Sequence, residues 1–154
     1  MSEHNPFDRV VEPWEAVIED MEATAAEYRE AGWEVLELHP GDVTVLDGDR
    51  YGLDVLVPGN EYERLTDLAA TGTFDSYEVY RADESGIAFV LAVLEDPAGE
   101  QAVCCPAYYE TTEADGMARR ADAEGRMYTH IRPLANDEAV TFAYEDPDLF
   151  FQDN

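Results

Sequence analysis

The chain has 154 residues, the length of a single domain. It carries 36 acidic and 9 basic residues, for a net charge of −27, and all nine basic residues are arginines. This balance argues against nucleic acid as a partner, since nucleic-acid binding needs a basic surface. The longest apolar run, IAFVLAVL, falls far short of the roughly 20 residues of a membrane span, so we expect no membrane association.

The acidic excess predicts a protein adapted to high salt. A strongly negative surface repels itself at low ionic strength, which opposes folding, whereas at molar salt the Debye length of about 3 Å screens that repulsion. The apolar fraction of 45% is typical of a folded domain. The N-terminal sequence lacks the apolar core of a signal peptide. We therefore expect a halophilic, archaeal, cytoplasmic protein whose stability depends on salt.

Residues 1–12 are expected to form a loose arm, and residues 13–154 a single domain. A helix is predicted from Pro13, which suits a first turn, to the residue before Gly32, which suits the position after a helix end. Apolar side chains recur at helical spacing between them: Trp14, Val17, Ile18, Met21, Ala25 and Tyr28.

The next segments read as strands and one more helix. Strands are predicted over 33–38, 43–47 and 51–57, and a helix over 58–72, where Asn60 and Glu63 resemble a capping box. The strand patterns of FDSYEVYR, IAFVLAVLE and EQAVCCPAYYE, separated by short turns, predict an antiparallel meander. Its middle strand is apolar on both faces, so we expect it to be central and covered on both sides.

A third helix is predicted over 112–124, followed by strands over 126–134 and 138–144. The predicted order is α-β-β-β-α-β-β-β-α-β-β. It indicates an α+β fold in which about three helices pack on a largely antiparallel sheet. The aromatic tail, DLFFQDN, is expected to fold back on its own domain.

The chain's two cysteines, Cys104 and Cys105, are adjacent within a predicted strand. Neighbours in a strand point to opposite faces, and a disulfide between adjacent residues would need strained geometry. The residues around them contribute neither metal-ligand spacing nor a basic neighbour that would activate a thiol. We interpret both as small buried hydrophobic residues, with redox, metal and nucleophilic roles as alternatives.

One stretch of the chain is locally positive. Arg119, Arg120, Arg126 and Arg132 fall within fourteen residues that hold only two acids. Strand alternation places Tyr128, His130 and Arg132 on one face, which could bind an anion such as a phosphate or a partner's carboxylate. The alternative is that these arginines pair with the protein's own acids.

The segment 47–58 resembles a calcium loop at Asp47, Asp49 and Gly52, but Tyr51 and Pro58 break the pattern, so we interpret it as a hairpin turn. We predict no catalytic residues, no metal and no cofactor. The sequence favours a non-enzymatic protein-interaction or regulatory module that binds a protein partner or a second copy of itself. The alternative is a small enzyme or anionic-ligand-binding domain using the face of Tyr128, His130 and Arg132.

Two stretches, EAGWEVLELHPGDVTVLD and GRMYTHIRPLANDEAVTFAYEDPDLFF, resemble a haloarchaeal family of small acidic proteins of unknown function. The resemblance runs from the first helix to the C-terminal phenylalanines. It implies a taxonomic origin and carries no site residues.

Overall fold

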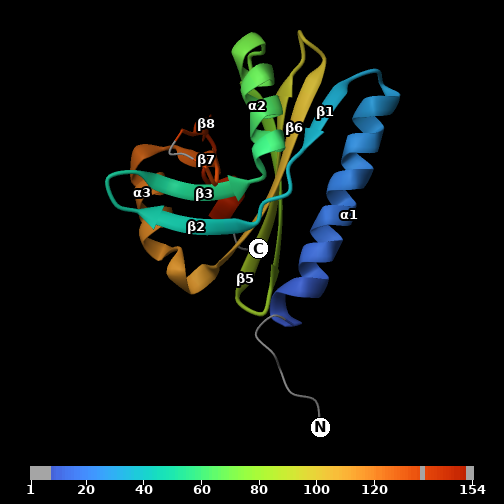
Figure 1. Ribbon diagram of the computed structural model, residues 1–154. Helices are drawn as coiled ribbons and strands as arrows, with labels where there is room; N and C mark the ends of the chain where they lie inside the picture. Colours follow the sequence, from blue (N-terminus) through green and yellow to red (C-terminus); the bar gives the residue numbers. More distant parts are fainter. Residues whose placement is uncertain (1–7, 136–137, 152–154) are drawn as a thin grey trace.

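The computed structural model describes residues 8–135 and 138–151 (Figure 1). The predicted α+β order is confirmed. The helices are α1 (Asp8–Glu30), α2 (Gly59–Thr71), the 3-10 turn η1 (Thr111–Glu113), α3 (Asp115–Glu124) and the short α4 (Asp148–Phe151). The strands are β1 (Glu34–Glu37), β2 (Asp42–Asp47), β3 (Tyr51–Val57), β4 (Ser76–Glu84), β5 (Ile87–Asp96), β6 (Gln101–Glu110), β7 (Met127–Pro133) and β8 (Val140–Tyr144).

The first sheet has the order β1-β6-β5-β4. Strands β4, β5 and β6 form the predicted antiparallel meander, and β1 adds to β6 in parallel. A proline in an inner strand usually removes a ladder hydrogen bond. Pro106 avoids this cost on the β1 side, because the pairing of β1 with β6 ends at Cys104.

The second sheet has the order β2-β3-β7-β8. Its central pair, β3 and β7, is parallel, and the two outer pairs are antiparallel. Gly52 in β3 has φ +124°, and a Cβ there would lie 2.3 Å from the carbonyl oxygen of Tyr128. Only glycine allows this close approach of β3 to β7.

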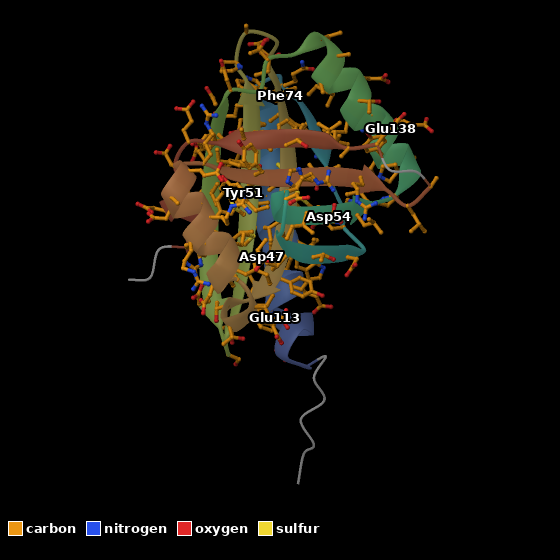
Figure 2. The ribbon with its side chains drawn as sticks, turned by 90° about the vertical axis from the view of Figure 1, so that its left-hand side faces the viewer. Asp47, Tyr51, Asp54, Phe74, Glu113 and Glu138 are labelled. Atoms are coloured by element: carbon orange, nitrogen blue, oxygen red, sulfur yellow. The ribbon has the colours of Figure 1, made fainter. Side chains whose placement is uncertain are left out.

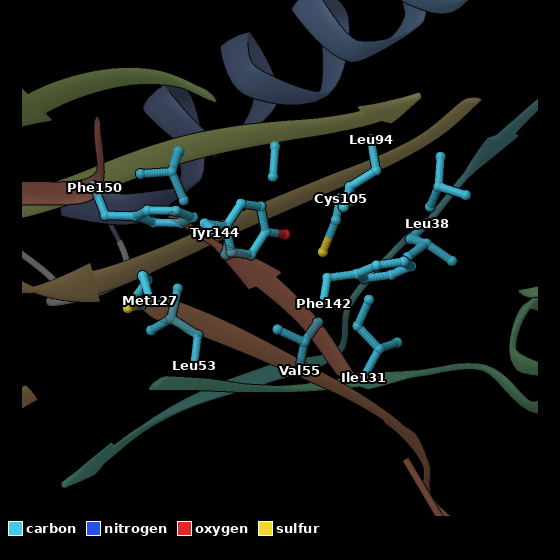
Figure 3. Close-up of a cluster of buried hydrophobic side chains, with 14 of the residues drawn as sticks. Leu38, Leu53, Val55, Leu94, Cys105, Met127, Ile131, Phe142, Tyr144 and Phe150 are labelled. Carbon is cyan, nitrogen blue, oxygen red and sulfur yellow. The ribbon is translucent and has the colours of Figure 1, made fainter. Parts of the chain in front are cut away.

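Where the sequence predicts one largely antiparallel sheet, the structure has two mixed sheets facing each other. The strands of the second sheet run across those of the first (Figure 1). Side chains from both sheets fill the main core between them, together with apolar residues of α2 and α3. Figure 3 shows its centre, where Cys105 of the first sheet lies near Phe142 and Tyr144 of the second.

Helix α1 covers the opposite face of the first sheet. It packs against β1, β5 and β6 and forms a second, smaller core that includes Met21, Ala25 and Leu91. The molecule is therefore layered: α1, the first sheet, the second sheet. Within the described residues no helix is long and apolar enough to cross a membrane.

Two sequence predictions about helix starts are wrong. Helix α1 begins at Asp8, so residues 8–12 are helical and do not belong to a loose arm. Pro13 lies inside the helix, where a proline removes the hydrogen bond to the carbonyl four residues earlier and its ring crowds that carbonyl. Helix α2 begins at Gly59 with Pro58 at its N-cap, so Asn60 lies within the first turn and caps nothing. Residues 1–7 lie outside the described part of the chain.

The described part of the C-terminal tail folds back on the domain, as predicted. Phe150 is fully buried, and its ring meets that of Tyr144 edge to face, with the centroids 4.9 Å apart. The hydroxyl of Tyr109 donates a hydrogen bond of 2.6 Å to the backbone carbonyl of Phe150. The tail thus closes one side of the main core.

Candidate functional site

The face predicted to bind an anion is the outer face of the second sheet (Figure 2). Strand alternation works as expected: Thr129 and Ile131 are buried toward the core, while the rings of Tyr128 and His130 stack outside with centroids 6.0 Å apart. His130 is nevertheless only 5% exposed. The hydrogen-bond partners of its ring nitrogens therefore determine whether the ring is free to bind a ligand.

Both ring nitrogens of His130 have partners. Nε2 lies 3.0 Å from the backbone carbonyl oxygen of Tyr51, and Nδ1 lies 3.0 Å from the hydroxyl of Thr141. Because a carbonyl oxygen only accepts, Nε2 donates, and in the neutral ring Nδ1 accepts from the hydroxyl. His130 therefore joins β7 to both neighbouring strands.

Arg132 is committed to Asp54 of the adjacent strand β3. Its Nε and Nη2 donate to the two carboxylate oxygens at 2.8 and 2.9 Å. Asp54 is 8% exposed. This two-pronged geometry is the strongest that a guanidinium and a carboxylate form. Asp54, whose charge would be costly to bury alone, is the partner that the sequence analysis did not identify.

The other three arginines of the predicted anion-binding face lie in α3 or directly after it. The Arg120 guanidinium lies 4.7 Å from the centre of the Tyr51 ring, donates to the carbonyl of Gly48 and pairs with Glu124 at 3.3 Å. Arg119 and Arg126 are exposed.

Through Tyr51, whose ring centre is 5.3 Å from that of Tyr128, the structure connects Arg120 to the stacked pair. It does not bring Arg132 to the same place. Tyr128 and Arg132 lie about 13 Å apart along the strand.

The two cysteines point to opposite faces of β6, as predicted. Cys104 packs beneath α1, and Cys105 packs in the main core (Figure 3). Both are buried free thiols, and burial raises the pKa of each to about 12. Their burial among the apolar side chains of the two cores confirms the interpretation of both as packing residues.

A groove of about 780 Å³ lies between α1 and the edge strand β4. It exists because a four-stranded sheet is about 14 Å wide, whereas one helix is about 10 Å across. Helix α1 packs over β1, β6 and β5, and the outer face of β4 stays open, with Glu78, Tyr80 and Ala82 all exposed. Phe89 and Leu91 of β5, the cross-strand partners of Ala82 and Tyr80, form the apolar floor.

The other wall of the groove is α1. The residues of α1 that line the groove include both apolar or small side chains and acids along one side of the helix: Val17, Asp20, Ala23, Thr24 and Glu27. The groove thus combines an apolar floor with acidic walls.

Three aromatic side chains gather at one end of the groove: Tyr28 from the last turns of α1, Trp33 from the segment between α1 and β1, and Tyr80 from β4. The Tyr28 and Trp33 ring centres are 5.1 Å apart. The Tyr28 hydroxyl donates to the carboxylate of Glu95, and the Tyr80 hydroxyl donates to Glu78 at 2.7 Å. We call Tyr28, Trp33 and Tyr80 the aromatic end.

The sequence analysis missed this groove. It assigned Tyr28 to the helix core and placed Tyr80 in a strand of the meander. The available signal was the outward row Glu78, Tyr80, Ala82 on a strand next to a fully apolar one. That row marks β4 as an edge strand with an uncovered face.

With the geometry established, comparison with known proteins gives one match. A family model, described as a family of unknown function (DUF7529), matches residues 2–152. The chain belongs to that family. Neither the curated proteins nor the solved structures include a match.

The DUF7529 match spans every element of the fold, including α1 and β4 on the two sides of the groove. The family description carries no activity, so the function of a DUF7529 domain must be argued from its surfaces.

Proposed function

We propose that this domain is a non-enzymatic protein-interaction module and that the groove between α1 and β4 binds a segment of a partner protein. The carrying observation is the uncovered face of β4, where Tyr80 is 51% exposed and Ala82 is also exposed, above a floor made by the buried Phe89 and Leu91. Apolar surface left open in a concave site is typical of a binding site, because covering it with a ligand releases water.

The shape of the groove supports a chain segment as the ligand. Its wall runs from Val17 to Ala31, about 21 Å at 1.5 Å per residue. An extended segment of about six residues, or a helix of about four turns, matches that length. A small metabolite would fill only part of a groove of about 780 Å³.

Charge supports a different protein over a second copy of the chain. The groove walls carry Asp20, Glu27 and Glu78, on a chain with a net charge of −27. Self-association through this face would bring like charges together, which costs free energy unless salt screens them.

The test uses position-specific cross-linking. Ala23 lines the groove, and Ala26, three residues later on the same helix, is exposed outside it. Ala23→Cys and Ala26→Cys proteins, each labelled with benzophenone maleimide, are irradiated in extract of the source organism at multimolar KCl. We expect one partner segment to cross-link reproducibly from position 23 and not from position 26.

A second pair of variants controls for the groove itself. Ala82→Arg places a long charged side chain in the groove, whereas Ala143→Arg places the same side chain on exposed β8. The cross-link from position 23 should disappear with Ala82→Arg and persist with Ala143→Arg. Equal cross-linking from both positions, or none from position 23, would contradict the proposal.

The second candidate is anion binding at the outer face of the second sheet. The exposed Arg119 and Arg126, together with the stacked Tyr128 and His130, support it. The pairing of Arg132 with Asp54 weakens it, since an anion would have to compete with that carboxylate. Binding of inorganic phosphate or ATP that is unchanged in an Arg126→Gln, Arg132→Gln variant would eliminate this candidate.

We further propose that the domain works in a halophilic, archaeal cytoplasm. The support is the composition: 36 acids, 9 arginines and no lysine. Its test is the salt dependence of unfolding described in the Discussion.

A further inference from the structure

The aromatic end of the groove has a strongly negative environment. The Tyr80 hydroxyl bonds to Glu78, and this bond, together with partial burial, raises the pKa of Tyr80 to about 12. Burial and the bond to Glu95 raise the pKa of Tyr28. The charge of Glu95 also raises the pKa of Tyr80, and the charge of Glu78 also raises the pKa of Tyr28. Both phenols therefore stay neutral beside two carboxylates.

The arginines nearest this end are engaged elsewhere. Arg29 reaches toward β1, where its Nη1 lies 2.8 Å from a carboxylate oxygen of Glu37. Arg81 belongs to the inward-facing row of β4, and its Nε lies 2.9 Å from a carboxylate oxygen of Asp83. Arg81 also lines the groove, but the acids that line it, Asp20, Glu27 and Glu78, outnumber it.

Aromatic faces beside carboxylates are the setting in which proteins hold organic cations. The negative face of an aromatic ring attracts an ammonium or guanidinium group within about 6 Å of its centre. Carboxylates nearby add charge-assisted hydrogen bonds. At molar salt such contact interactions persist better than long-range attraction, because only separations beyond the Debye length are strongly screened.

We infer that the aromatic end binds a basic side chain of the partner segment, with the cation against Tyr28, Trp33 and Tyr80 and its N–H groups directed to Glu78. This inference rests on the proposed function and specifies its ligand: a segment with an arginine or lysine at one end and apolar residues along the floor. The alkyl stem of the basic residue would extend toward Leu91, the cross-strand partner of Tyr80.

The probe is a pair of short peptides, acetyl-Arg-Ala-Leu-Ala-Leu-amide and the same peptide with citrulline in place of arginine. Citrulline keeps the size and shape of arginine and removes the charge. Binding is followed by ¹H–¹⁵N NMR of the full chain in high KCl, through its two tryptophan indoles. Trp33 lies at the aromatic end, and Trp14, which packs on Tyr108, is the internal control.

We expect the arginine peptide to shift the Trp33 indole signal and leave that of Trp14 unchanged, and the citrulline peptide to bind about tenfold more weakly. Tyr80→Leu and Glu78→Gln should each weaken binding of the arginine peptide about fivefold. Glu145→Gln, an exposed acid on another part of the surface, should leave it unchanged.

The outcomes separate this inference from the proposed function. Equal binding of both peptides, or no shift of Trp33 with either, would overturn the cation site and leave the cross-linking result at position 23 to decide the proposed function. Selective binding of the arginine peptide without a cross-link at position 23 would support the cation site and contradict the protein partner.

Discussion

Asp54 of β3 and Arg132 of β7 join the two parallel central strands of the second sheet through a two-pronged ion pair, with distances of 2.8 and 2.9 Å. His130 is the register partner of Asp54 across the two strands, and Arg132 lies two residues further along β7. On a surface this acidic, the arginine offsets a carboxylate that would otherwise be nearly buried without a counter-charge.

Breaking this ion pair should destabilise the domain. Arg132→Gln leaves the Asp54 carboxylate without its cation, and we expect it to cost about 2 kcal/mol of the free energy of unfolding, less than for a fully buried pair because the arginine is partly exposed. Asp54→Asn should cost a similar amount. In the double variant the losses should not add, and urea unfolding in 3 M KCl measures all three. Strict additivity would show that the pair contributes no coupling.

Stability should fall at alkaline pH, beginning near pH 9. Burial raises the pKa of Cys104 and Cys105 from 9.0 to about 12, so the folded state keeps two protons that the unfolded state releases. The stabilising contribution is complete below pH 9 and is lost as the pH rises from 9 toward 12. Urea midpoints measured across this range should show the loss.

The control for the alkaline effect is Cys104→Ala, Cys105→Ala. This variant should keep a flat stability profile up to about pH 10, above which the buried tyrosines, including Tyr144, begin to lose protons in the unfolded state. A profile identical to that of the unmodified chain would show that the thiols do not carry the effect.

Removing the aromatic tail should weaken the main core. Phe150→Ala empties a fully buried site beside Tyr144 and should cost about 3–5 kcal/mol. Leu149→Ala, at a neighbouring position that is 36% exposed, should cost less than about 1 kcal/mol. Truncation after Asp146 should reproduce the Phe150→Ala loss in thermal unfolding. A truncated chain of unchanged stability would show that the tail does not stabilise the fold.

Thermal stability should depend steeply on salt. The melting temperature should drop as KCl falls below about 1 M, because repulsion among 36 acids is then no longer screened. Circular dichroism at several KCl concentrations measures this. Replacing the exposed Glu15, Glu19 and Glu22 of α1 by Gln should reduce the slope. A melting temperature independent of salt would contradict the halophilic interpretation.

Local patterns in the sequence are enough to predict most elements and side-chain directions. Alternation correctly places Cys104 and Cys105 on opposite faces, and Tyr128, His130 and Arg132 on one. The division into two sheets depends on parallel pairs such as Val35 with Ala102, which lie far apart in the chain. Such pairings leave no local signature, because each strand pattern is compatible with several neighbours.

The groove could not be predicted from the sequence for a related reason. Its chemistry is visible in the sequence as Tyr80 beside Glu78, yet its existence depends on where α1 lies across the sheet. Asp54 had a weaker local signal, since a carboxylate within the apolar strand YGLDVLV needs a partner. The identity of that partner depends on the parallel pairing of β3 with β7.

The adjacent cysteines on β6 allow two different opening motions of the fold to be followed by thiol labelling of a single dipeptide. Cys104 reacts with a thiol reagent only after α1 lifts from the first sheet, and Cys105 only after the two sheets separate. The ratio of their labelling rates in the native state reports whether α1 opens independently of the two sheets. A partner that binds between α1 and β4 would slow the labelling of Cys104 and leave the labelling rate of Cys105 unchanged.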